Sequence, residues 1–134
     1  MNDEFKPIRV LVADDSEVVR EFLADVMNGN DSVELVGTAS DANSAIELAK
    51  QTEPDVAVLD WMMPNGGGPR AAEELKAQRD EIRIVGISAE DPVAASVQMK
   101  TTGAVAFLVK GFTGEQLIEA IHSAAAAESE RPQH

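Results

Sequence analysis

The residues of this sequence that could do chemistry are three carboxylates, a serine and a lysine, each close behind a short apolar run. The carboxylates are Asp14, Asp15 and Asp60, and the other two residues are Ser88 and Lys110. Two unit charges about 4 Å apart repel by roughly 4 kcal/mol at an effective dielectric near 20. Carboxylates that lie together therefore need a divalent cation, a raised pKa or a lysine beside them. Carboxylate oxygens without sulfur or imidazole suit Mg²⁺ or Mn²⁺.

The apolar runs that precede these residues are typical of buried strands. Residues 56–59 form a continuous apolar run that is too short for a globular helix and shows no alternation. Such a run predicts a strand buried on both faces of a parallel sheet. Pro64 and the glycines at 66–68 prevent this strand from continuing beyond Asp60. Further strands are expected over residues 8–13, 33–39, 82–87 and 105–109.

Helical patterns alternate with the strands. The first follows Asp15 or Ser16, either of which can cap it, and its apolar stripe is Val18, Val19, Phe22, Leu23 and Val26. Further helices are expected over residues 41–51, from about residue 69, over 91–102 and after residue 113. Five strand–helix units predict an α/β fold, with a doubly wound five-stranded parallel sheet in the order 2-1-3-4-5. In this flavodoxin-like (βα)5 arrangement the reactive residues share the carboxyl edge of the sheet, at the switch point.

In this order, the residues resemble the receiver domain of bacterial two-component response regulators, the CheY-like family. The resemblance covers residues 8–127 and rests on motifs at the strand ends: Asp14-Asp15, Asp60 with Met63-Pro64, Ser88-Ala89, and Lys110 with Phe107. The chain is then expected to divide into an N-terminal extension (1–7), a receiver domain (8–127) and a polar tail or cut linker (128–134).

The resemblance implies a phosphoacceptor and a metal site. Asp60 would accept a phosphoryl group from a histidine kinase, a phosphotransfer protein or a small phosphodonor. Asp15 would bind Mg²⁺ (or Mn²⁺) directly, with Asp14 supporting it. Asp60 and the backbone carbonyl of Met62 would complete the protein's share of the ligands.

The resemblance also implies a switch. Ser88 and Lys110 would hold phosphoryl oxygens, and Ser88 moving toward the phosphate would let Phe107 turn inward. The face formed by helix 91–102, strand 105–109 and the last helix would then change. An effector, an output domain or a second copy of the chain would bind this face. Such a regulator is not an enzyme beyond self-catalysed phosphorylation and dephosphorylation.

The region around the reactive residues contains one departure from the family pattern. The family usually has proline after the lysine, with a cis bond, and this sequence has Gly111, so the loop is expected to run differently. Trp61 is expected to be a semi-exposed loop ring, and Met62 and Met63 are expected to pack in the loop. The glycines at 66–68 predict a mobile turn beside the metal.

Two other functions compete with this interpretation. The first is a constitutive interaction module, a pseudo-receiver with the same fold and no phosphorylation. The second is a haloacid-dehalogenase-like phosphatase with Asp60 as its nucleophile. That family requires a second aspartate two residues later, where this sequence has Met62.

Composition limits the partners. The formal net charge of −13 opposes direct binding to nucleic acids or anionic membranes. There are no cysteines, and no apolar run approaches the ~18 residues of a membrane span. Residues 1–7 lack the apolar core of a signal peptide. These features favour a cytoplasmic location.

Overall fold

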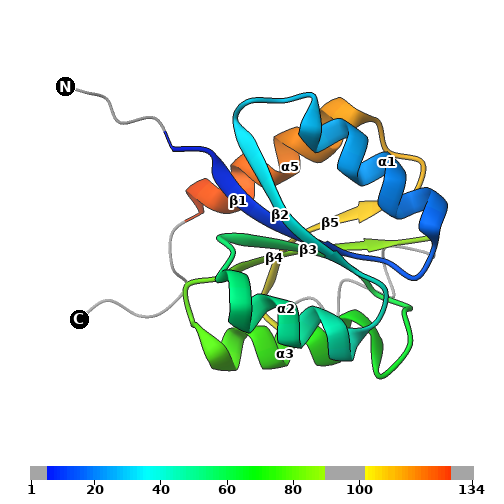
Figure 1. The fold of residues 1–134 in the computed structure, drawn as a ribbon, viewed down its shortest axis with the longest axis vertical. Helices are drawn as coiled ribbons and strands as arrows, with labels where there is room; N and C mark the ends of the chain where they lie inside the picture. Colours follow the sequence, from blue (N-terminus) through cyan, green and yellow to red (C-terminus); the bar gives the residue numbers. More distant parts are fainter. Residues whose placement is uncertain (1–5, 90–101, 128–134) are drawn as a thin grey trace.

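The computed structural model describes residues 6–89 and 102–127. Five parallel strands form one sheet in the order β2-β1-β3-β4-β5 (Figure 1). The strands are β1 (Ile8–Ala13), β2 (Val33–Ala39), β3 (Val56–Asp60), β4 (Arg83–Ser88) and β5 (Ala104–Val109). The helices are α1 (Glu17–Asn28), α2 (Ala42–Thr52), α3 (Gly67–Gln78) and α5 (Gly114–Ala126). The predicted fold class and strand order are confirmed.

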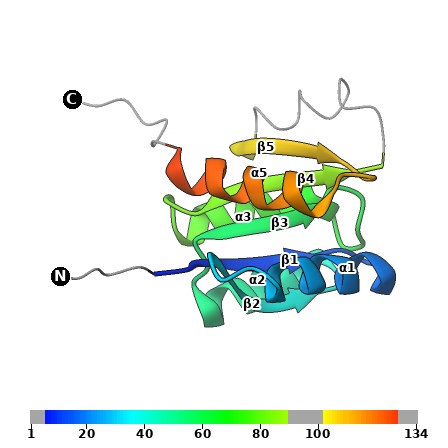
Figure 2. The same cartoon turned by 90° about the horizontal axis from the view of Figure 1, so that it is seen from above.

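The helices cover both faces of the sheet. Helices α1 and α5 lie on one face and α2 and α3 on the other (Figure 1). Strand β1 shows how one strand serves both layers, since Val10 and Val12 pack toward α1 and α5 while Leu11 and Ala13 pack toward α2 and α3. All five residues of β3 are buried, as expected for the central strand. Seen from above, the arrowheads of the strands point the same way, so their carboxyl ends share one edge (Figure 2).

Local signals set the helix ends. Ser16 caps α1 by accepting a hydrogen bond from the Val19 N–H, and Asp41 caps α2 in the same way. Thr113 and Gln116 form a capping box at α5. Helix α3 begins at Gly67, two residues before the predicted start. The predicted helix over 91–102 lies outside the described residues, except for its last residue.

The predicted apolar stripe of α1 is wrong at two positions. Val18 is 75% exposed and Phe22 is 39% exposed, whereas Leu23 and Met27 are the buried residues of this helix. The sheet and α5 cover a face of α1 that is narrower than the apolar stripe predicted from the sequence. Phe22 instead meets Phe112, with ring centroids 5.9 Å apart.

Among the described residues, no helix is long and apolar enough to cross a membrane.

Candidate phosphoacceptor and metal site

The residues singled out from the sequence lie along the carboxyl edge of the sheet. Asp60 and Ser88 are the last residues of β3 and β4, while Asp14 and Lys110 directly follow β1 and β5. The strand register aligns these ends, because Ala13 pairs with Leu59 in β3 and Asp60 pairs with Ile87 in β4. Four strands therefore deliver these side chains to one place in the fold.

Three carboxylates form the centre of this edge. One oxygen each of Asp14, Asp15 and Asp60 lies within 4.8 Å of the others. Asp14 is fully buried and Asp60 is 2% exposed, whereas Asp15 is exposed. The buried Oδ2 atom of Asp14 has no hydrogen-bond partner. A buried carboxylate oxygen without a hydrogen bond, beside two further carboxylates, fits a hard divalent cation such as Mg²⁺.

Lys110 supplies the positive charge of this cluster. Its Nζ atom lies 3.0 Å from Asp14 Oδ2 and 3.6 Å from Asp60 Oδ1, and its side chain is 26% exposed. The contact with Asp14 is an ion pair rather than a well-aligned hydrogen bond. Burial favours the neutral amine, but the close contacts with the negative charges of Asp14 and Asp60 outweigh burial, so the pKa of Lys110 lies above its ordinary value.

The surroundings of Asp60 favour its protonated form. Burial raises its pKa above the ordinary value, and the neighbouring charge of Asp14 raises it further. Lys110 and the hydrogen bond that the Met62 N–H donates to Oδ1 (3.3 Å) oppose this shift without cancelling it. A bound cation would stabilise the carboxylate form.

The loop after β1 is anchored at three points of one residue. The Asp14 N–H donates to Ala39 O (3.0 Å), and the Ser16 N–H donates to Asp14 Oδ1 (2.9 Å). The third anchor is Arg20, whose Nη1 donates to Asp14 O (2.9 Å). Sequence reasoning did not single out Arg20. The available signal was its spacing, because a residue four positions after the helix cap lies one turn into α1, within reach of the end of β1.

The predicted placement of Trp61 is wrong. Its side chain is 5% exposed, and it belongs to the core cluster on the α2 and α3 face. A Cβ atom at Gly68 would overlap the indole, and one at Gly86 would lie 2.9 Å from Cζ3. Two glycines from separate elements thus leave room for the ring. Gly68 is a packing position within α3, whereas Gly66 and Gly67 have positive φ where the turn leads into the helix.

The two methionines behave differently from each other. Met63 was expected to pack in the loop; it is buried at 4% exposure and belongs to the core cluster on the α2 and α3 face. The side chain of Met62 is 68% exposed, so the prediction that it packs in the loop is wrong. Its backbone N–H contacts Asp60, which places the Met62 peptide beside the carboxylates.

Ser88 lies on β4 and Phe107 on the neighbouring strand β5. Ser88 is 2% exposed, and its carbonyl accepts a hydrogen bond from the Lys110 N–H (2.7 Å). Phe107 is partly buried and meets Trp61 edge to face. A Cβ at Gly86 would lie 2.7 Å from Cδ1 of Phe107, so Gly86 also makes room for this ring.

The loop after Lys110 accommodates the unusual glycine. Gly111 has φ of 107°, and no cis peptide bond occurs among the described residues. The ammonium of Lys110 nevertheless reaches both Asp14 and Asp60. The loop therefore delivers the lysine by a backbone conformation that favours glycine.

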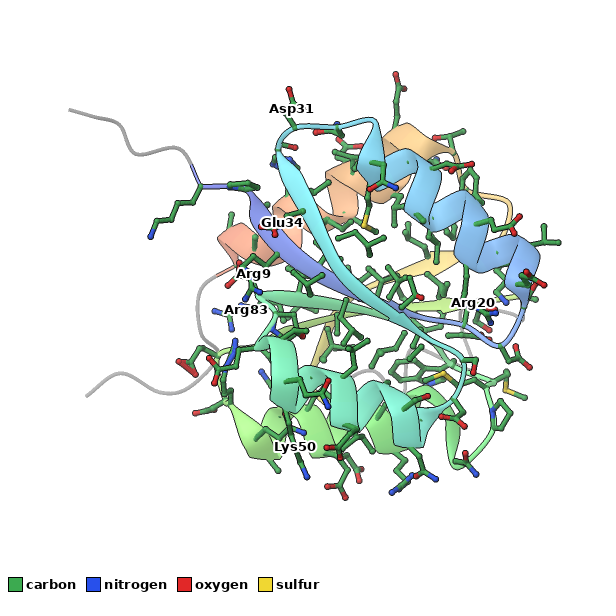
Figure 3. All side chains as sticks on the ribbon, viewed as in Figure 1. Arg9, Arg20, Asp31, Glu34, Lys50 and Arg83 are labelled. Carbon is green, nitrogen blue, oxygen red and sulfur yellow. The ribbon has the colours of Figure 1, made fainter. Side chains whose placement is uncertain are left out.

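Basic side chains are concentrated at the opposite edge of the sheet. Arg9 donates to the carbonyls of Thr52 and Glu53, and Arg83 donates to Ala127 O. Arg9 and Arg83 lie near the amino ends of the strands, whereas Arg20 lies at the other end of the sheet (Figure 3). Within residues 6–89 and 102–127, the ion pairs of the three carboxylates are those of Lys110 with Asp14 and Asp60.

Comparison with known proteins agrees with this architecture. Residues 10–122 match the family described as the response regulator receiver domain. The transcriptional regulatory protein YxjL of Bacillus subtilis is 37% identical over 122 residues, which cover 91% of this chain and 56% of that protein. The transcriptional regulatory protein NarL of Mycobacterium tuberculosis is 35% identical, over 90% of this chain and 56% of that protein.

Solved receiver domains superpose on most of the chain. The signal receiver domain of NarL from Mycobacterium tuberculosis has a TM-score of 0.86 at 34% identity, and covers 92% of this chain and 99% of that one. The response regulator domain of CheB from Thermotoga maritima has a TM-score of 0.82 at 30% identity, with the same coverage. The chain spans about half the length of the curated relatives it matches. This chain belongs to the response regulator receiver domain family of two-component signalling.

Proposed function

We propose that this chain is a phosphoacceptor switch in which Asp60 receives a phosphoryl group in the presence of Mg²⁺. The observation that carries this proposal is the meeting of three carboxylates and one ammonium at the ends of β1, β3 and β5. Phosphoryl transfer requires positioned charges more than covalent assistance. The cluster offers a nucleophile, a cation site and a fixed positive charge within a few ångströms.

Each residue would have its own role in phosphoryl transfer. A carboxylate oxygen of Asp60 attacks phosphorus, and the bond from phosphorus to the donor's nitrogen or oxygen breaks as the acyl phosphate forms. Asp14, Asp15, Asp60 and the carbonyl of Met62 would hold Mg²⁺, which when bound neutralises charge on the phosphoryl oxygens. Lys110 would leave its ion pairs with the carboxylates and contact one of these phosphoryl oxygens instead.

Ser88 and Phe107 would carry the response. Ser88 ends the strand next to Asp60, so its hydroxyl would donate to a phosphoryl oxygen. A shift of Ser88 would change the packing beside Gly86, over which Phe107 and Trp61 lie. The exposed side of β5 and α5 would then change, as a population shift between two packings. This face would contact an effector, an output domain or a second copy of the chain.

The relatives suggest what the switch controls. Two of them are named transcriptional regulatory proteins, and each is longer than this chain. With a net charge of −13, the domain would act on transcription through another domain or protein and not by touching DNA. A histidine kinase or phosphotransfer protein would be its phosphodonor.

Trp61 provides a test, because it is the one tryptophan of the chain, directly follows Asp60 and contacts the ring of Phe107. Beryllofluoride with Mg²⁺, a mimic of the phosphoryl group, should change its emission in a saturable way. Asp60→Asn should abolish this change, and Ser88→Ala should reduce it. An emission unaffected by beryllofluoride in the wild type would support the constitutive interaction module instead.

A further inference from the structure

Arg20 is a basic side chain near the carboxylate cluster that touches none of its carboxylates. It belongs to α1, and its Nη1 atom donates to the backbone carbonyl of Asp14 at 2.9 Å, in a partly buried position. Figure 3 shows it beside the end of β1, away from Arg9 and Arg83. Lys110, in contrast, lies against the side chains of Asp14 and Asp60. Arg20 and Lys110 therefore make different kinds of contact.

The carbonyl that Arg20 holds belongs to the peptide unit joining Asp14 to Asp15. A peptide unit is planar, so fixing the direction of the carbonyl also fixes the N–H and the Cα atom of Asp15. The other two anchors of this loop hold the Asp14 N–H and the Asp14 side chain. Arg20 thus holds the peptide unit on the amino side of Asp15, while the bond from the Ser16 N–H to Asp14 Oδ1 holds the peptide unit on its carboxyl side.

Asp15 depends on this backbone for its position. Its side chain is exposed, and within the part of the chain that the structure describes it accepts no hydrogen bond and forms no ion pair. One of its carboxylate oxygens nevertheless lies within 4.8 Å of those of Asp14 and Asp60. A carboxylate without side-chain partners keeps such a place only if its main chain is held.

We propose that Arg20 is a positioning residue that sets the affinity of the site for a divalent cation by fixing the Asp14–Asp15 peptide. The proposal rests on the function proposed above, since it assumes that the carboxylates bind a cation. Groups that orient metal ligands typically change metal affinity by about 10- to 100-fold when they are removed.

Geometry and charge make opposite predictions for the loss of Arg20. If Arg20 acted only as a nearby positive charge, its removal would reduce repulsion and tighten cation binding. If it positions Asp15, its removal loosens a ligand and weakens binding. The sign of the change in affinity therefore separates the two roles.

The experiment measures Mn²⁺ binding by electron paramagnetic resonance of the free ion, on folded protein checked by circular dichroism. Arg20→Met should weaken binding about 10-fold or more. Arg20→Lys retains the charge and a single donor nitrogen, so its affinity for Mn²⁺ should lie between those of the wild type and Arg20→Met. Arg79→Met is the matched control, because Arg79 also donates to a loop carbonyl, that of Pro54, but at the opposite edge of the sheet. It should bind Mn²⁺ as the wild type does.

Unchanged or tighter binding by Arg20→Met would overturn the proposal, as would an equal loss in Arg79→Met. If Arg20→Met does not fold, Arg20→Lys is compared with the wild type instead. Mn²⁺ should then bind several-fold more weakly to Arg20→Lys, and equal affinities would contradict the proposal. Wild-type protein that binds Mn²⁺ and gains a phosphoryl group, with no effect of Arg20, would overturn this inference alone. Wild-type protein that binds no Mn²⁺ would overturn both this inference and the proposed function.

Discussion

The rings of Trp61 and Phe107 meet edge to face, with centroids 5.6 Å apart and planes at 84°. Trp61 directly follows the candidate phosphoacceptor, and Phe107 lies on β5, two strands away from β3. Between them, on β4, Gly86 contributes no side chain. This contact connects the candidate site to the exposed side of β5 and α5, where partners are proposed to bind.

Gly86→Ala should disturb this contact and destabilise the protein. The added Cβ would lie 2.7 Å from Cδ1 of Phe107 and 2.9 Å from Cζ3 of Trp61, so both rings must shift. Overpacking of a core position typically costs about 1–3 kcal/mol in the free energy of unfolding. Urea unfolding followed by circular dichroism measures this cost.

Gly29→Ala is the matched control for this variant. A Cβ at Gly29 would meet only ordinary contacts, 3.5 Å or more away, at a φ of −91°. Its unfolding free energy should change by no more than about 0.5 kcal/mol. Equal unfolding curves for Gly86→Ala and the wild type would show that the two rings have other room to move.

Asp60→Asn should stabilise the protein at neutral pH when no Mg²⁺ is present. Burial and then the charge of Asp14 raise the pKa of Asp60 in the folded state. The ionised carboxylate therefore lowers the free energy of unfolding, which is the cost of keeping it charged. This cost is present in full above the raised pKa. It falls as the pH is lowered through that pKa, and it is absent below the ordinary carboxyl pKa of about 3.9.

The gain from Asp60→Asn should therefore be largest near pH 7 and shrink toward pH 4, as measured by urea unfolding at several pH values. Asp31→Asn removes the same charge from an exposed loop position and should change stability by about 0.5 kcal/mol or less. A destabilised Asp60→Asn at pH 7 would mean that the ion pair with Lys110 outweighs the burial of the carboxylate.

Lys110→Met should have opposite effects on cation binding and on phosphorylation. Removal of the ammonium 3.0 Å from Asp14 reduces repulsion, so Mg²⁺ should bind several-fold more tightly. The phosphorylation rate with acetyl phosphate should fall about 100-fold, since a charged group aimed at developing charge is lost. Calorimetry and intact mass over time measure the two quantities.

Lys50→Met provides the control, because Lys50 is an exposed lysine in the last turn of α2. It should change neither quantity. A rate for Lys110→Met equal to that of the wild type would remove the lysine from the proposed mechanism.

Gly111→Ala should destabilise the loop after β5 through the backbone alone. No atom lies within 4 Å of a Cβ built at this position, but its φ of 107° is strained for any residue with a side chain. Such strain costs about 1–3 kcal/mol. Unfolding by urea measures the loss, and a stability equal to that of the wild type would show that the loop can adopt another conformation.

The sequence predicted the strands and the chemistry at their ends because both are local signals. The run 56–59 is short, apolar and closed by Asp60, and the parallel sheet brings such ends together. The structure places Asp14, Asp15, Asp60 and Lys110 in one cluster, with Ser88 on the strand beside Asp60.

What the sequence could not show depends on contacts between distant elements. The burial of Trp61 requires Gly68 on α3 and Gly86 on β4, and no pattern within the loop reveals either contact. The exposure of Val18 depends on how wide a face of α1 the sheet and α5 can cover. The bond from Arg20 to the Asp14 carbonyl depends on the path of one loop.

The role of Asp60 as phosphoacceptor can be tested by the intact mass of the chain after incubation with acetyl phosphate and Mg²⁺. We expect one added phosphoryl group, absent in Asp60→Asn and absent when EDTA removes the metal. A wild-type chain with no added group, or an equal adduct in Asp60→Asn, would contradict the assignment of Asp60 as the phosphoacceptor.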